Sequence, residues 1–224
     1  MNILVIDVGG SNVKILATGQ AAARKFPSGP SLTPQVMVAG VKELAADWAY
    51  DVITIGYPGV VRHGQIIQDP RNLAPGWVGF DFEAAFSKPV RLLNDAAMQA
   101  LGSYEGGTML FLGLGTGLGS ALVVESVVLP LELAHLPYKK GTYEDYLGKR
   151  GLARLGKKKW RNQVDLCVGS FIAALQLDDV VLGGGQVKEL KALPPGCRAG
   201  HNSNAFLGGF RLWETDKTAF HLAS

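Results

Sequence analysis

The sequence predicts an α/β chain folded as two lobes of like design, each a mixed sheet with flanking helices. Two observations support this prediction. A strand, a glycine turn and a second strand occur near residues 2–17, and the same pattern returns about 105 residues later, near residues 108–124. After each hairpin, short apolar strands alternate with segments of helical spacing. We therefore expect an internal duplication, with an N-terminal lobe at residues 1–105 and a C-terminal lobe at residues 106–224.

The first half opens with a predicted hairpin. Residues 2–6 are apolar and β-branched, and strand character resumes at residues 13–17 after the Gly9–Gly10 turn. Residues 35–48 carry apolar side chains at helical spacing, which predicts an amphipathic helix. Two buried strands and a short helix complete this half, at residues 51–55, 90–93 and 96–101.

The second half repeats this design. Residues 108–112 and 120–124 are predicted strands on either side of the turn Gly113–Gly119. The remaining predicted elements are a helix, a strand, a short helix and a final helix, at residues 164–177, 179–182, 187–190 and 204–213. We expect the final helix to pack back on the N-terminal lobe.

Composition excludes several classes of protein. Glycine accounts for 29 of 224 residues, well above its usual share of about 7%, but without the period of three that collagen requires. A hydrophobic fraction of 47% argues against disorder, and two cysteines are too few for a disulfide scaffold. A net charge of +3 does not by itself indicate nucleic-acid binding. The apolar runs are too short to cross a membrane and the opening residues do not look like a leader, so we expect a cytoplasmic protein that binds neither nucleic acid nor membrane.

Three glycine-rich turns follow predicted strands, at Asp7–Ser11, Gly115–Gly119 and Gly183–Gly185. Such turns let backbone N–H groups approach phosphate oxygens closely. None is a P-loop, and the second is not a dinucleotide fingerprint, because a strand rather than a helix follows it. Three turns in this order are more specific than one, since single hairpin turns use glycine routinely. The phosphate-binding candidates are Gly9, Gly10, Ser11, Lys14, Gly115, Thr116, Gly117, Gly183, Gly184 and Gly185.

Two acidic residues stand beside these turns. Asp7 ends the first strand, where its carboxylate is suited to hold Mg²⁺ through water; the alternative is an aspartate that stabilises the turn. Asp95 follows a predicted strand and precedes a predicted helix. We expect it to be the base that accepts a proton from a hydroxyl attacking a phosphoryl group. The alternative role, a helix N-cap, does not exclude this one.

These motifs, in this order, resemble the ROK family of sugar kinases and repressors, within the actin-like ATPase superfamily. Asp7-Val8-Gly9-Gly10-Ser11 is similar to the family's first phosphate motif, Gly115-Thr116-Gly117-Leu118-Gly119 to its second, and Leu182-Gly183-Gly184-Gly185 to its nucleotide-side turn. Leu93-Asn94-Asp95-Ala96 resembles the segment with the family's catalytic aspartate, and Tyr57-Pro58-Gly59-Val60-Val61 a loop of its sugar pocket. The last two segments most resemble the polyphosphate glucokinases of the family.

The resemblance implies an actin-like (ribonuclease H-like) fold with the active site in the cleft between two lobes. It implies Asp95 as the catalytic base toward a sugar 6-hydroxyl. Glu132 and His135 match the family's Glu-x-Gly-His motif, although Ala134 replaces the glycine. Glu144 is our candidate for a further sugar-binding glutamate, with a surface acid at a helix start as the alternative; for His135 the alternative is a structural histidine. The implied substrate-binding residues are Gly59, Val60, Asn72, Asn94, Asp95, Glu132, His135 and Glu144.

The main departure from the family concerns zinc. Many members carry a cluster of cysteines after the histidine of this motif. Here the next cysteine after His135 is Cys167, and no Cys-x-Cys occurs. A tetrahedral site of nitrogen and sulfur ligands cannot be assembled nearby, so we expect no structural zinc.

A basic segment stands apart from the mild charge of the whole chain. Residues 139–161 hold nine basic residues and two acids, a local net charge of +7, so the remaining residues carry −4. Its densest part is Lys157, Lys158 and Lys159. The simplest interpretation is a solvated face; the sharper one is an electrostatic track for polyphosphate, whose charges flexible lysines bind without fixed geometry. Nucleic acid is a weaker alternative, because beyond Trp160 aromatic residues are not interleaved with the basic ones.

Together these features predict a glucokinase-type phosphotransferase that requires Mg²⁺ and moves a phosphoryl group from polyphosphate, ATP or both to the 6-hydroxyl of glucose. Two alternatives stay open: an ATP-only hexose or aminosugar kinase, and a non-catalytic sugar-binding member of the family. The residues do not rank glucose against mannose or glucosamine. By resemblance we also expect a homodimer.

Overall fold

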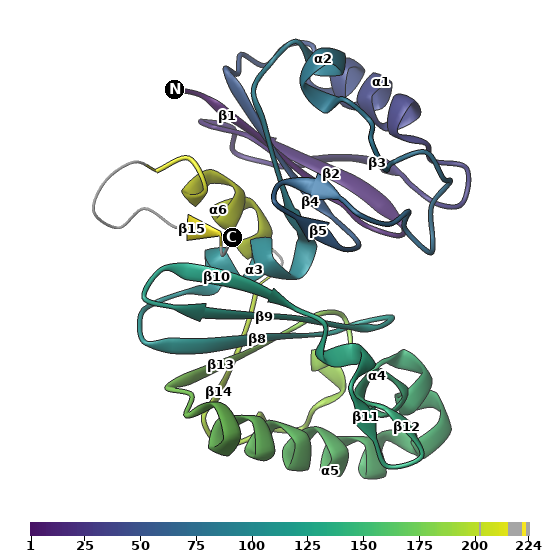
Figure 1. Ribbon diagram of the computed structural model, residues 1–224, viewed down its shortest axis with the longest axis vertical. Coiled ribbons are helices and arrows are strands. Elements are labelled where there is room, and N and C mark those ends of the chain that lie inside the picture. The colour runs from purple at the N-terminus through teal and green to yellow at the C-terminus, as the bar shows by residue number, and fades with distance from the viewer. Residues whose placement is uncertain (202, 215–220, 223–224) are drawn as a thin grey trace.

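A computed structural model describes residues 1–201, 203–214 and 221–222 of the chain. Two mixed sheets lie on either side of a central pair of helices, and further helices cover the outer face of each sheet (Figure 1). Alternate residues of a central strand therefore face different layers. In the first strand, Leu4 and Ile6 pack with the outer helices, whereas Val5 packs with the central pair.

The first sheet consists of β1 (Ile3–Val8), β2 (Asn12–Ala17), β3 (Arg24–Pro27), β4 (Val52–Tyr57) and β7 (Val90–Asn94). Its order is β3-β2-β1-β4-β7. β1 and β2 form the expected antiparallel hairpin, β3 is antiparallel to β2, and β4 and β7 run parallel to β1. All six residues of β4 are buried, as expected for a strand with helices on both faces.

The second sheet consists of β8 (Thr108–Leu114), β9 (Leu118–Val124), β10 (Val127–Leu131), β13 (Asp179–Gly183), β14 (Cys197–Ala199) and β15 (His221–Leu222). Its order is β14-β13-β8-β9-β10-β15. β8 and β9 form the second antiparallel hairpin, and β13 and β14 continue parallel to β8. The run β10-β9-β8-β13-β14 therefore repeats the directions of β3-β2-β1-β4-β7, which confirms the duplicated α/β design.

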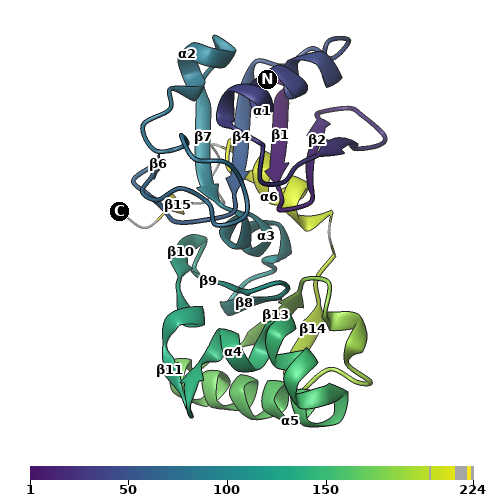
Figure 2. The ribbon, with the colours of Figure 1, turned by 90° about the vertical axis from the view of Figure 1, so that its right-hand side faces the viewer.

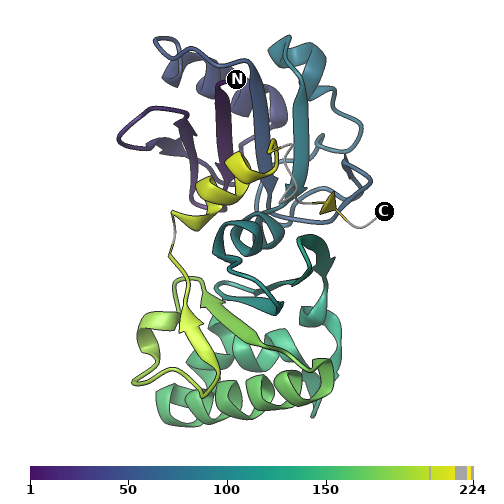
Figure 3. The ribbon, with the colours of Figure 1, turned by 90° about the vertical axis from the view of Figure 1, so that its left-hand side faces the viewer.

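Six helices complete the layers: α1 (Pro34–Leu44), α2 (Phe82–Phe86), α3 (Asp95–Ser103), α4 (Tyr143–Leu147), α5 (Lys149–Leu175) and α6 (Asn204–Arg211). α1 and α2 cover the outer face of the first sheet, and α4 and α5 lie below the second (Figures 1 and 2). Met37 of α1 joins the core of the first sheet and Trp160 of α5 joins that of the second. α3 and α6 share the middle core with both sheets (Figure 3).

The two central helices touch through glycines. A Cβ at Gly102 of α3 would lie 1.8 Å from the carbonyl oxygen of Asn204, and one at Gly208 of α6 would lie 1.8 Å from that of Met98. α6 also packs on the first sheet, where Thr54 Oγ1 donates a 2.7 Å hydrogen bond to the carbonyl of Gly209. The absence of side chains at the crossing therefore fixes how closely α3, which begins at Asp95, approaches α6.

Smaller elements carry loops toward the cleft. Two short hairpins are formed by β5 (Val61–Arg62) with β6 (Gln65–Ile66), and by β11 (Pro137–Tyr138) with β12 (Gly141–Thr142). Single 3₁₀ turns are η1 (Leu133–His135) and η2 (Val187–Glu189). The segment expected as a helix at residues 187–190 is this second 3₁₀ turn. None of the helices in the described part of the chain is long and apolar enough to cross a membrane.

One prediction for the second half is wrong at its start. The helix expected from residue 164 begins at Lys149, so it includes the basic segment. Gly156, with φ of +74°, kinks it and interrupts the helical spacing that a sequence pattern would show. Trp160 and Val164 are buried against the second sheet, while Lys157, Lys158 and Lys159 are exposed on the solvent side. A helix with so many basic residues is stable here because its apolar side packs on a sheet.

Candidate active site

The carboxyl ends of the parallel strands bring the predicted motifs together. Asp7 of β1 pairs in register with Gly56 of β4, and Tyr57 of β4 pairs with Asn94 of β7. In the second sheet Gly113 of β8 pairs with Gly183 of β13. Residues that immediately follow these strands therefore lie at one edge of each sheet, the place where α/β folds bind ligands.

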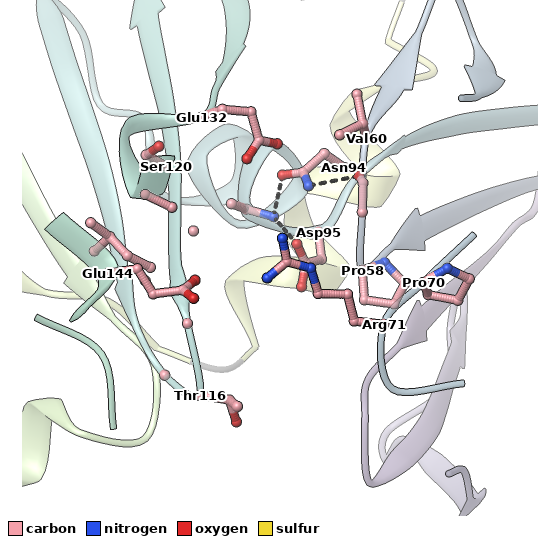
Figure 4. Close-up of a pocket in the computed structure, with 18 of the residues that line it drawn as sticks. Pro58, Val60, Pro70, Arg71, Asn94, Asp95, Thr116, Ser120, Glu132 and Glu144 are labelled. Atoms are coloured by element: carbon pink, nitrogen blue, oxygen red, sulfur yellow. Dashed lines mark hydrogen bonds between the residues drawn. The ribbon is translucent and has the colours of Figure 1, made fainter. Parts of the chain in front are cut away.

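A cavity of about 390 Å³ is lined by residues from both sheets (Figure 4). Its wall contains parts of the first two predicted phosphate turns, one glycine of the third, and all eight predicted substrate-binding residues. The predicted residues that line it are Gly10, Gly59, Val60, Asn72, Asn94, Asp95, Gly115, Thr116, Gly117, Glu132, His135, Glu144 and Gly184.

Other predicted residues lie outside this wall. Asp7, Gly9, Ser11, Lys14, Gly183 and Gly185 belong to the same turns and strand ends but do not line the cavity. Lys157, Lys158 and Lys159 lie on α5, on the far side of the second sheet from the middle helices. Lys157 Nζ is 2.6 Å from a carboxylate oxygen of Glu189, so the charge of this lysine is already paired.

Asp95 is the first residue of α3, and its carboxyl group has an unusual pKa. Burial raises the pKa of Asp95 to about 7, and the negative charges of Asp7 and Glu132 add to this shift. The N–H of Ala96, which donates a 2.8 Å bond to Asp95 Oδ1, acts in the opposite direction. A carboxylate with a pKa near neutral is suited to accept a proton at physiological pH.

Asn94 holds the start of this helix. Its Oδ1 accepts hydrogen bonds from the N–H groups of Ala96 and Ala97, at 2.9 and 3.2 Å, and is thus the N-cap. Its Nδ2 donates a 3.0 Å bond to the carbonyl of Gly59. The helix N-cap, the alternative considered for Asp95, is therefore its neighbour, and the same amide ties α3 to the loop after β4.

Asp7 lies across the first hairpin from Lys14, whose Nζ is 3.1 Å from Asp7 Oδ2. The side chain of Asp7 is largely buried, with 13% exposed. Among the described residues no group of three or more His, Cys, Asp or Glu side chains is arranged to hold a metal by itself. Mg²⁺ needs only one or two carboxylates when phosphates and water supply the other oxygens. One carboxylate beside a phosphate turn fits an ion held in that way.

The glycine turns permit close backbone approach where side chains would not fit. A Cβ at Gly9 would lie 2.9 Å from the carbonyl oxygen of Asn12. Gly184 has φ of +84°, and a Cβ there would lie 2.4 Å from the carbonyl oxygen of Leu114. Gly115 accepts a 3.0 Å bond from the N–H of Lys149, which anchors the start of α5 beside the second phosphate turn.

Two pairs of residues bring the predicted sugar-binding side chains of the second half into the cavity. His135 Nε2 is 3.4 Å from Glu132 Oε2. η1 begins next to Glu132 and ends at His135, and Ser120 of β9 accepts a hydrogen bond from its first N–H group. A Cβ at Gly117 would lie 2.5 Å from Glu144 Oε2. Glycine at this position therefore lets the Glu144 carboxylate pack directly against the second phosphate turn. Glu132 and Glu144 both extend into the cavity in Figure 4.

Sequence reasoning missed several lining residues. Gln99 follows Asp95 by four positions on α3, so helical spacing alone placed it on the same face. Arg71 precedes the predicted Asn72, and adjacency was its only signal. Ser120 gave no signal, because a serine in a strand has no distinctive pattern.

Cys167 is buried and Cys197 is partly buried. Both are free thiols, and burial raises the pKa of each.

Comparisons with known families and sequences relate this chain to sugar kinases. The model of the ROK family matches residues 3–129. A polyphosphate glucokinase of Mycobacterium tuberculosis is 27% identical in an alignment of 206 positions, which covers 80% of this chain and 76% of that protein.

Solved structures share the arrangement of both sheets. An inorganic polyphosphate/ATP-glucomannokinase from Arthrobacter sp. strain KM has a TM-score of 0.78 at 21% identity, over 93% of this chain and 96% of that one. A ROK family glucokinase from Streptomyces griseus, solved with glucose and AMPPNP, has a TM-score of 0.76 at 14% identity, over 95% and 99%. At these identities the likeness establishes the fold.

Proposed function

The chain belongs to the ROK family and has its actin-like fold, and on that premise we propose that it is a sugar kinase that phosphorylates the 6-hydroxyl of glucose. The observation that carries this proposal is the position of Asp95. Its carboxylate, with a pKa of about 7, lies in a cavity whose wall includes parts of all three glycine turns. A carboxylate that can accept a proton, in the same cavity as glycine turns suited to phosphate, supports phosphoryl transfer to a hydroxyl.

In the proposed reaction the sugar hydroxyl attacks the terminal phosphorus of the donor. The O6–P bond forms, the bridging P–O bond breaks, the leaving phosphate keeps the electron pair, and the hydroxyl proton passes to the Asp95 carboxylate. Transfer of this kind depends on positioning and on neutralising charge rather than on covalent chemistry with the protein. The buried environment that raises the pKa of Asp95 also limits access of water as a competing acceptor.

The glycine turns would hold the donor. Backbone N–H groups at Gly9, Gly10 and Gly115 to Gly117 are the proposed phosphate ligands, with Gly183 to Gly185 on the nucleotide side. Mg²⁺, when bound with the donor, would neutralise phosphate charge. Asp7 would hold that ion through water, and Lys14 keeps the Asp7 carboxylate in place.

The sugar would lie against the Asp95 side of the cavity. Gly59, Val60, Asn72 and Asn94 come from the first half of the chain, and Glu132, His135 and Glu144 from the second. Carboxylates and amides are suitable partners for the many hydroxyls of a hexose, because each oxygen accepts and each amide N–H donates. The donor, by contrast, would contact mainly the backbone N–H groups of the glycine turns.

Polyphosphate is the donor that we propose alongside ATP. The M. tuberculosis relative is named for polyphosphate, and the Arthrobacter structure for both donors. In this chain α5 begins beside Gly115, and its exposed basic residues lead away from that turn. Lys158 and Lys159 form no ion pair within the described part of the chain, whereas Lys157 is paired with Glu189. A polyanion that leaves the phosphate turn along α5 would therefore meet free positive charge.

Two other functions remain alternatives. An ATP-only hexose or aminosugar kinase would use the same cavity without the α5 lysines. A non-catalytic sugar-binding protein is suggested by Ala134, which replaces the family's glycine. Its methyl group is buried in the core of the second sheet, and the Glu132–His135 pair beside it remains intact. This packing favours an active enzyme over a sensor. A homodimer remains a prediction.

One assay tests the proposal. Purified protein is incubated with glucose, mannose or glucosamine, each with ATP and with long-chain polyphosphate, in the presence of Mg²⁺, with Asp95→Asn as the blank. Formation of a 6-phosphosugar above the blank supports the kinase. If no combination of sugar and donor gives a phosphorylated product, while calorimetry shows that the protein binds a sugar, the non-catalytic alternative would be established instead.

A further inference from the structure

The charges that line the cavity are unbalanced. Its acidic residues are Asp69, Asp95, Glu132 and Glu144, and Arg71 is the one lysine or arginine among the described residues of the wall. A phosphoryl donor carries several negative charges into this space. Phosphoryl transfer needs positive charge near the equatorial oxygens of the transferred group. Lys14, a predicted phosphate ligand, does not line the cavity and is paired with Asp7.

The backbone around Arg71 is fixed although its side chain is exposed. Two residues earlier, Asp69 Oδ1 accepts hydrogen bonds from the N–H groups of Gly76, Trp77 and Val78, and these bonds hold the pKa of Asp69 below its usual value. Two residues later, Leu73 is buried in the core of the first sheet. An arginine between two such anchors presents its side chain from a defined position, which lowers the entropy cost of binding a ligand.

Arg71 lines the same cavity as Asp95, next in sequence to a residue that contacts the first phosphate turn. The next residue, Asn72, lies against the first phosphate turn, since a Cβ at Gly10 would be 3.9 Å from the Asn72 Cβ. In Figure 4 the Arg71 side chain extends from the Pro70 loop into the cavity that Asp95 also lines. Arg71 forms no hydrogen bond or ion pair with any residue that the structure describes. Its guanidinium is therefore free to take an external anion.

We propose that Arg71 is a catalytic residue that binds the transferred phosphoryl group and stabilises its charge as the O6–P bond forms. A guanidinium suits this task because it presents two parallel N–H donors to two phosphate oxygens. The inference rests on the proposed kinase activity and adds a cation from the first half of the chain to the backbone turns. Arg71 keeps its charge throughout, and the hydroxyl proton still passes to Asp95.

Kinetics of Arg71→Gln and Arg71→Lys test this assignment. Arg62→Gln is the matched control, because Arg62 is exposed on the neighbouring β5 but does not line the cavity. We expect kcat to fall about 10²–10³-fold in Arg71→Gln, the usual loss when one transition-state donor is removed. The KM for glucose should change less than about threefold. Arg71→Lys should regain on the order of tenfold, because it restores charge without the bidentate geometry.

Two kinetic outcomes would overturn the assignment while leaving the kinase intact. Activity of Arg71→Gln equal to that of Arg62→Gln would show that no phosphate contact is lost. A loss confined to the KM for glucose would make Arg71 a sugar ligand. The pH profile gives a further check: a loss of kcat that disappears at high pH, where Asp95 is fully ionised, would show that Arg71 acts only through the pKa of Asp95, which contradicts direct contact.

Binding of tripolyphosphate separates this inference from the kinase proposal. Calorimetry with Mg²⁺ needs no turnover, so it reads out the anion site even if no sugar is phosphorylated. An affinity at least tenfold weaker in Arg71→Gln than in Arg62→Gln supports the phosphate contact. Equal affinities in the two variants would overturn it, whether or not the wild-type protein is a kinase.

Discussion

Lys14 Nζ lies 3.1 Å from Asp7 Oδ2 across the β1–β2 hairpin, so the carboxylate near the end of β1 is held in place by its strand partner. The charge of Asp7 still reaches Asp95, whose pKa it helps to raise. Activity should therefore decline as the pH falls below about 7, because protonated Asp95 cannot accept the hydroxyl proton.

Asp7→Asn should move this decline in activity, the acid limb of the pH profile, to lower pH. Removing the negative charge lowers the pKa of Asp95, so the carboxylate stays ionised in more acidic solution. The measurement is kcat/KM between pH 5 and pH 9 for both proteins, with saturating Mg²⁺ to limit effects on donor binding. A limb that stays in place would show that Asp7 does not act on Asp95 electrostatically.

Asp95→Asn should abolish turnover and leave the fold intact, because an amide cannot accept the proton. Its stability should depend on pH in a specific way. The pKa of Asp95 is about 7 in the folded chain and about 4 in an unfolded one, so the folded state holds the extra proton between these values. Ionisation therefore destabilises the wild-type fold as the pH rises from about 4 to 7.

The Tm of Asp95→Asn relative to wild type should accordingly increase over this range and level off above it. Thermal unfolding followed by circular dichroism at several pH values measures the difference. A constant difference in Tm would contradict the raised pKa, and retained phosphorylation would remove Asp95 from the role of base.

Replacing Lys157, Lys158 and Lys159 together by glutamine should impair polyphosphate use selectively. We expect the KM for long-chain polyphosphate to rise about tenfold and its dependence on salt to become shallower, while ATP kinetics stay unchanged. The matched control removes the same charge from Lys25, Lys42 and Lys191, which are exposed and lie outside α5. If both triple variants behave alike, net charge rather than a track on α5 explains donor use.

Gly208→Ala should destabilise the fold by about 2–4 kcal/mol, because the new methyl would meet the backbone carbonyl of Met98, which cannot yield as a side chain can. Gly169→Ala on α5 is the control, since a Cβ there meets no atom within 4 Å and alanine favours a helix. Denaturant unfolding measures both. Equal stabilities would mean that α3 and α6 separate without cost.

The local pattern of the sequence was sufficient for much of the fold. Strands at β1, β2, β4, β7, β8, β9 and β13 were predicted because apolar, β-branched runs ended at glycine or polar turns. The strands β3, β10 and β14 were missed. β3 and β14 lie at sheet edges, where a short strand with one neighbour needs no apolar run. The first half of α5 was missed because the Gly156 kink and dense charge concealed its buried side.

The candidate site likewise divides into features that local sequence predicts and features that only the tertiary structure shows. Sequence alone predicted that glycine turns and Asp95 follow strands, and that phosphate binding and proton transfer take place there. Only the tertiary structure decided that Arg71 faces the same cavity as Asp95, that Lys14 is paired with Asp7, and that the α5 lysines lie outside the cavity wall. The physical reason is that strand-end motifs are local, whereas charge pairing and burial depend on side chains that the two packed sheets bring together from distant parts of the chain.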